Sequence, residues 1–197
     1  MKPLHRTLAR FAPLVALFPS LALAHPGHPG HDFTWDFNTG FSHPWSGADH
    51  LLAMIAVGIW AVQLGGRSRW LIPAAFIAMM SIGAVLGRAG GAIPGIEQGI
   101  AASVFALGLL VATARRVPLW VGMTLTGFFA LFHGYAHGVE IPSTAAGFSY
   151  GIGFVCATAS LHAIGLGLGT LAGKTSRRIT AVAGCAIAAA GLLLLAT

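Results

Sequence analysis

The sequence predicts an all-α membrane protein: a bundle of six transmembrane helices that follows a cleaved signal peptide, with both termini on the periplasmic side. The first observation is composition, because 56% of the 197 residues are hydrophobic and only 8% are charged, which is typical of chains solvated by lipid. The second is a series of six apolar segments, each long enough to cross a bilayer as a helix. The third is the distribution of basic residues, which favours one orientation in the membrane.

The N-terminal 24 residues have the features of a secretory signal peptide. Lys2, Arg6 and Arg10 precede an apolar stretch at 11–23, and the segment ends in Ala22-Leu23-Ala24, an A-x-A cleavage site. We therefore assign 1–24 to a signal peptide, 25–42 to a histidine-containing periplasmic segment and 43–197 to the six-helix transmembrane domain. The alternative is a first anchor that is not cleaved.

Residues 25–32 read H-P-G-H-P-G-H-D. Such a histidine-bearing stretch can collect metal ions at low affinity in the periplasm. The alternative interpretation is an ordinary flexible polar leader.

The six apolar segments are separated by short loops that differ in charge. They cover 46–64, 70–87, 96–113, 117–137, 144–172 and 178–196. If the mature N-terminus is periplasmic, Arg88 is the only basic residue in the outer loops. The inner loops then carry Arg67, Arg69, Arg115, Arg116, Lys174, Arg177 and Arg178. This asymmetry follows the positive-inside rule and predicts a multi-pass protein of the bacterial inner membrane.

The same orientation places the acidic residues on or near the outer side, where a cation would first be met. They are Asp32, Asp36, Asp49, Glu97 and Glu140. Small residues four apart, such as Gly83 and Gly87, let helix backbones approach closely in lipid. The first three and last three helices could also form an inverted pair.

The formal net charge of +6 does not indicate nucleic-acid binding, because the basic residues lie in short clusters between apolar segments, where they set topology. The expected partners are the lipid bilayer and a transition-metal dication, with no nucleic acid. A homo-oligomer remains open. We expect no prosthetic group.

The first motif lies at the start of the first transmembrane segment. It places two imidazoles and a carboxylate, His43, Asp49 and His50, within eight residues. Ionisable groups at membrane depth are costly and normally mark an ion or substrate path. A purely structural alternative is an S-x-x-D capping box formed by Ser46 and Asp49, although it leaves both histidines unexplained.

The second motif ends the fourth segment. His133 and His137 are spaced i, i+4, which places both rings on one helix face, and Glu140 follows on the same stripe. The alternative for Glu140 is an interfacial acid, but a carboxylate at a helix C-terminus opposes the helix dipole. Because the first helix starts and the fourth ends at the outer face, we expect the two motifs to meet in one site. Imidazole and carboxylate donors together suit nickel, cobalt, copper and zinc.

His162 lies further along the fifth segment, past the expected membrane centre. It is either a second station for the ion on the inward path or a core histidine bonded to a neighbouring Ser or Thr.

Three segments of the chain resemble the HupE/UreJ family of nickel and cobalt permeases. They are H-P-x-x-G-x-D-H-L-x-A-M at 43–54, V-G-x-W-A at 57–61 and F-H-G-x-A-H-G-x-E at 132–140. The resemblance covers almost the whole chain after the signal peptide. It implies that the metal path includes His43, Asp49, His50, His133, His137 and Glu140. It also implies import of Ni²⁺ or Co²⁺ for hydrogenase or urease maturation.

Three other functions compete with transport. An intramembrane metalloenzyme could use the same His/Asp cluster, because a metal with an open position can activate water, and a sensor could simply hold the metal. A rhomboid-type protease is disfavoured, since Ser149 and His162 lie on one helix about 20 Å apart. No P-loop is present to hydrolyse ATP. We therefore expect a secondary permease and not an enzyme.

Overall fold

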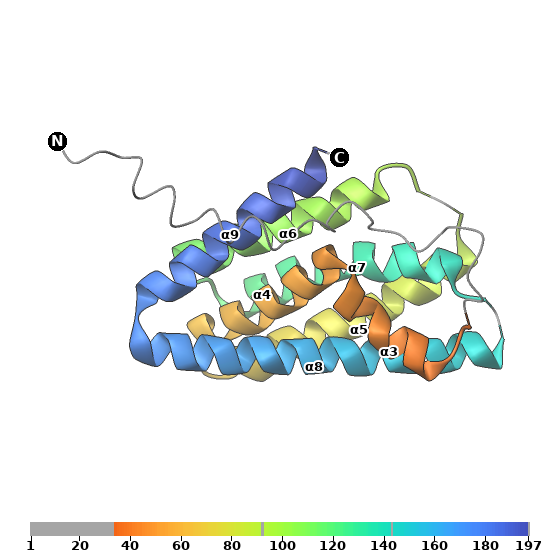
Figure 1. The fold of residues 1–197 in the computed structure, drawn as a ribbon, viewed down its shortest axis with the longest axis horizontal. Coiled ribbons are helices and arrows are strands. Elements are labelled where there is room, and N and C mark those ends of the chain that lie inside the picture. The colour runs from red at the N-terminus through yellow and green to blue at the C-terminus, as the bar shows by residue number, and fades with distance from the viewer. Residues whose placement is uncertain (1–33, 92, 143, 197) are drawn as a thin grey trace. The chain divides into compact units, whose positions relative to one another are not determined.

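The computed structural model describes residues 34–91, 93–142 and 144–196, which all belong to the compact unit Asp32–Thr197. These residues form helices joined by short connections and contain no strand (Figure 1). The all-α prediction is therefore confirmed for the described residues. The predicted signal peptide and the histidine-bearing stretch at 25–32 lie outside them.

Each of the six predicted apolar segments contains one helix, and a further helix precedes them. In chain order they are α3 (Phe37–Ser46), α4 (Ala48–Leu64), α5 (Ser68–Ala89), α6 (Ile96–Thr113), α7 (Leu119–Glu140), α8 (Ala145–Thr175) and α9 (Arg177–Leu195). Helix α3 crosses the predicted boundary between residues 42 and 43.

Four helices, α5, α6, α8 and α9, are long and apolar enough by themselves to cross a membrane. Helices α3 and α4 pass the same test only together, as a pair bent by 82°. Helix α7 has 22 residues, but its C-terminal turns carry two histidines, a glutamate and several glycines, which lower its mean hydropathy. Chain length and hydropathy thus identify a multi-pass membrane protein without establishing six spans.

Helix α3 forms because its N-terminus is capped and its backbone packs closely on α8. The Asp36 side chain accepts a hydrogen bond from the Thr39 backbone N–H at 2.8 Å, while the Asp36 N–H donates to the Thr39 hydroxyl. This is a capping box. The capping box that the sequence suggested at Ser46 and Asp49 is wrong: Gly47 caps α4 without a side-chain bond, and the Ser46 hydroxyl donates to the His43 carbonyl.

The long helices pack in pairs, with the most extensive contacts between α5 and α7, between α6 and α9, and between α4 and α8. In Figure 1, α8 runs along one side of the bundle beside α3 and α4, and α6 and α9 lie together on the other side. Helix α4 is the centre of the bundle, since almost every residue from Ala53 to Ala61 is buried. This arrangement brings the first turn of α4 and the last turns of α7 to the same end, called here the histidine end.

Candidate metal site

Three histidines from three helices meet at the histidine end of the bundle. His43 lies in the last turn of α3, His50 in the first turn of α4 and His137 in the last turn of α7. One ring nitrogen from each lies within 4.8 Å of the other two, and the Nε2 atoms of His50 and His137 are in contact. His50 and His137 are buried, whereas His43 is half-buried. We call these residues the three-histidine group.

Glycines beside the histidines allow this convergence. A Cβ at Gly134 would lie 2.7 Å from the Met80 carbonyl carbon, and one at Gly138 would lie 2.7 Å from the Ala84 Cα. The glycine after each α7 histidine therefore lets α7 pack directly on the α5 backbone. At the α3–α4 bend, a Cβ on Gly47 would lie 2.8 Å from Asp49 Oδ1, so a side chain there would displace the carboxylate.

Asp49 is placed behind His50 and not among the three donors. Its Oδ1 lies 2.7 Å from His50 Nδ1, and both residues are buried. The Nδ1–H that donates to the carboxylate fixes the imidazole tautomer, so that Nε2 carries the lone pair and faces the three-histidine group. This carboxylate–histidine arrangement is the one that commonly orients and strengthens a histidine ligand of a metal.

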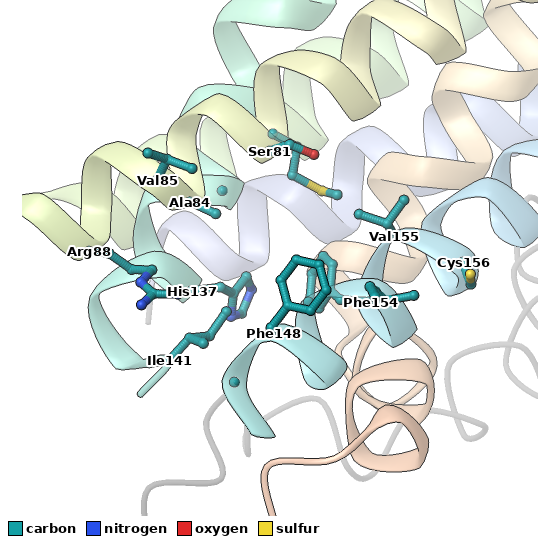
Figure 2. A pocket seen from close by; sticks show the side chains of 15 residues that line it. Ser81, Ala84, Val85, Arg88, His137, Ile141, Phe148, Phe154, Val155 and Cys156 are labelled. Carbon is teal, nitrogen blue, oxygen red and sulfur yellow. The ribbon is translucent and has the colours of Figure 1, made fainter. Parts of the chain in front are cut away.

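Aromatic rings form one wall of the group, and Figure 2 shows Phe154 of α8 beside His137. The Phe154 ring centroid on α8 lies 5.7 Å from that of His43, 5.8 Å from His50 and 4.8 Å from His137. Tyr150, one turn earlier, is buried with its ring 6.1 Å from His43. Sequence analysis missed both residues, because an aromatic residue in an apolar helix carries no distinctive signal.

His133 lies just outside the three-histidine group. Its ring centroid is 5.3 Å from that of His50, and the residue is fully buried. Its Nδ1 donates to the Phe129 carbonyl at 3.1 Å, a bond that leaves Nε2 with a lone pair. That Nε2 has no hydrogen-bond partner.

Comparison with known proteins identifies the family of this chain. The family model described as "HupE / UreJ protein" matches residues 13–194. The chain is also 45% identical over 179 residues to "Protein HupE" from Rhizobium leguminosarum bv. viciae, and the match covers 90% of this chain and 91% of that protein. This chain belongs to the HupE/UreJ family. No solved structure matches it.

As a HupE/UreJ protein with several apolar helices, the chain is a multi-pass membrane protein. Its structure brings only part of the predicted residue set together. Glu140 ends α7 and is exposed, outside the three-histidine group. His162 on α8 is buried, only 2% exposed, and neither of its ring nitrogens has a hydrogen-bond partner.

The donors of the three-histidine group fit a first-row transition-metal dication. Imidazole nitrogens suit nickel, cobalt, copper and zinc, whereas magnesium and calcium prefer oxygen. Two nitrogens that bind one such ion at about 2.1 Å each are at most about 4.2 Å apart. The 4.8 Å limit of the three-histidine group therefore requires only a small contraction around an ion.

Proposed function

We propose that this chain is a secondary permease that imports a transition-metal dication from the periplasm to the cytoplasm. Nickel is the foremost candidate, cobalt is the alternative, and the ion is cargo and not a prosthetic group. The three-histidine group carries the proposal, because buried metal-ligand side chains at one end of a membrane bundle are what an entry site for a cation requires. Membership of the HupE/UreJ family favours delivery to hydrogenase or urease maturation.

The proposed topology has six crossings of the bacterial inner membrane by α4–α9, with the signal peptide removed and both termini periplasmic. The basic residues of the α4–α5, α6–α7 and α8–α9 connections support it, because all lie at the end opposite the three-histidine group. On this topology α7 crosses the membrane with its two histidines turned towards the interior of the bundle, where polar groups are tolerated.

Helix pairing supports a transporter built from two inverted three-helix units. Helices α4 and α8 run parallel, since Gly58 faces Gly165 and Val62 faces Gly169 further along. Helices α5 and α7 also run parallel, whereas α6 and α9 run antiparallel. If α4, α5 and α6 correspond to α7, α8 and α9, the α4–α8 pair corresponds to the α7–α5 pair, and α6 meets its own counterpart. Such inverted repeats occur in many secondary transporters, which move one unit against the other.

An intramembrane metalloenzyme is the rival proposal. Three protein ligands leave a coordination position open, and an open position on a bound metal can activate water. A serine protease is not supported, because Ser149 and His162 both lie on α8, 13 residues apart, and a nucleophile and its base must be within hydrogen-bond reach.

Uptake of radioactive nickel by metal-starved cells tests the proposal. We expect cells with the wild-type chain to accumulate nickel, with cobalt the stronger and zinc the weaker competitor. His50→Ala should abolish accumulation at normal abundance in the membrane, because it removes a donor from the three-histidine group.

The matched control is Ser42→Ala on α3, whose exposed hydroxyl donates only to the Thr39 carbonyl. It should accumulate nickel like the wild type. Equal accumulation by wild type and His50→Ala would refute the site. No accumulation by well-expressed wild type would favour an enzyme or a sensor.

A further inference from the structure

Two buried histidines lie deeper in the bundle than the three-histidine group and have ring nitrogens without a hydrogen-bond partner. These are Nε2 of His133 and both nitrogens of His162. Leaving a buried polar group without a partner costs about 1–3 kcal/mol. Most buried polar groups in proteins are hydrogen-bonded, so these two histidines require an explanation. Gln63 Oε1 also lacks a partner, but its amide nitrogen donates to the Val111 carbonyl at 3.0 Å, so its side chain is held in place.

From the three-histidine group into the bundle, His133 comes first and His162 second. His50 lies beside His133, with 5.3 Å between ring centroids. The Phe76 ring on α5 comes next: its centroid lies 5.8 Å from that of His133 and 5.1 Å from that of His162. A single aromatic ring thus contacts both deeper histidines.

Two helices independently give the same depth for His162. On α8, His162 follows Phe154, which packs on the three-histidine group, by eight residues, or about 12 Å of helix. On α4, Gly58 follows His50 by eight residues, and its missing side chain lets the backbones of α4 and α8 touch at His162 and Gly165. This close contact holds His162 at a fixed height below His50.

The interval between the outer and deeper histidines also contains a hydroxyl and a thioether. Thr158, one turn before His162 on α8, has its hydroxyl 3.8 Å from the Met80 sulfur. Met80 is one turn from Phe76 on α5. Thr158 and Met80 therefore form a layer between His162 and the three-histidine group. Both side chains are weak ligands that a borderline metal ion can pass but not remain bound to.

We propose that His162 is a second binding station for the dication, reached from the three-histidine group through His133. The inference rests on the proposed function and adds the route by which the ion moves into the bundle. A neutral imidazole with both nitrogens unengaged can accept a borderline dication and release it. A station with fewer strong donors than the entry site binds more weakly, which lets the ion move on.

The test compares binding with flux for three purified variants, His162→Leu, His162→Gln and the control Ser160→Ala. Ser160 is half-buried on α8, and its hydroxyl donates to the Cys156 carbonyl of the same helix at 2.8 Å. Nickel binding is measured by calorimetry in detergent, nickel entry in sealed liposomes, and folding by the thermal midpoint. Leucine removes both nitrogens at similar volume, whereas glutamine keeps a polar group that is a poor ligand.

We expect both His162 variants to bind nickel within threefold of wild type and to lose at least tenfold in flux. His162→Leu should have an unchanged or higher thermal midpoint, because it removes two unpartnered nitrogens, and Ser160→Ala should match wild type. Wild-type flux in His162→Leu would overturn the inference, as would flux restored by glutamine or a tenfold loss of binding. Absence of flux in wild-type liposomes would instead overturn the proposed function itself.

Discussion

The histidine end of the bundle, where α3, α4 and α7 meet, differs from the α6–α9 pair in the hydrogen-bond partners of its buried polar atoms. In the α6–α9 pair, the buried Ser103 and Thr180 hydroxyls donate to carbonyls of their own helices. In the histidine region, one ring nitrogen from each of His43, His50 and His137 meets the other two across three helices, and Nε2 of His133 and both nitrogens of His162 have no partner. Buried polarity alone therefore does not indicate a site; the convergence of ring nitrogens from several helices does.

The α6–α9 pair is held together by close backbone packing at glycines, as α5 and α7 are, but neither α6 nor α9 carries a histidine. A Cβ on Gly108 of α6 would lie 2.7 Å from the Ala188 Cα of α9, and a Cβ on Gly184 would lie 2.6 Å from the Ala112 Cα. Close backbone packing of this kind is the main source of helix association in lipid. We therefore expect mutations in the α6–α9 pair to affect folding and mutations among the histidines to affect metal handling.

The largest effect should come from His137→Ala. Its imidazole lies in the three-histidine group opposite His50, so its loss should reduce nickel uptake to the level of cells without the protein. The thermal midpoint of the purified protein should change little, since removal of a buried ligand also removes its desolvation cost. Uptake and thermal unfolding are the measurements. Normal uptake together with a lowered thermal midpoint would show that His137 contributes to packing and not to metal binding.

A smaller loss is expected for Asp49→Asn. The carboxylate orients His50 through a 2.7 Å bond, and loss of such an outer partner typically weakens metal affinity by about 10–100-fold. Calorimetric titration with nickel measures the change. Asp36→Asn is the control, because Asp36 bonds only near the start of α3 and asparagine caps helices equally well. Equal affinities in wild type and Asp49→Asn would leave the carboxylate without a role at the site.

Gly108→Val should act on stability and leave the affinity of the folded protein for nickel unchanged. The added side chain meets the α9 backbone, and such overpacking costs about 1–3 kcal/mol. Membrane abundance and thermal midpoint should both fall. Gly167→Ala on α8 should have neither effect, since a Cβ there meets nothing within 4 Å. Normal stability of Gly108→Val would break the contrast between the two regions.

The smallest effect is expected for Ser103→Ala. Its hydroxyl donates to the Ile100 carbonyl of the same helix at 2.6 Å, and that carbonyl keeps its place in the helix without it. Stability should change by less than about 1 kcal/mol, and nickel uptake should be unchanged. A strong loss of uptake would show that buried polarity in α6 also serves transport.

The sequence predicted the helices and the meeting of His50 with His137, because both follow from simple regularities. Apolar segments of about 20 residues become helices in lipid, and alternating crossings bring the start of one helix and the end of another to the same end of the bundle. Helix α3 was not predicted, because its polar and aromatic residues around Pro44 resemble a loop. It depends on packing, since a Cβ at Gly153 of α8 would lie 2.8 Å from the Phe41 backbone nitrogen.

The arrangement of donors within the site was beyond sequence spacing. His133 and His137 share one helix face, but four residues separate them by about 6 Å along the axis, so only His137 reaches His43 and His50. Spacing likewise made Asp49 a candidate ligand, whereas side-chain orientation decides that its oxygen bonds His50. Such choices depend on neighbouring helices and are set only in the folded bundle.

Entry of nickel into sealed liposomes that contain only the purified chain tests the central claim most directly. A nickel-sensitive dye trapped inside reports entry, and wild type is compared with His50→Ala at equal protein content. The account predicts saturable entry for the wild type and none above the protein-free leak for the variant. Equal entry for both, or none for either despite correct folding, would contradict transport through the three-histidine group.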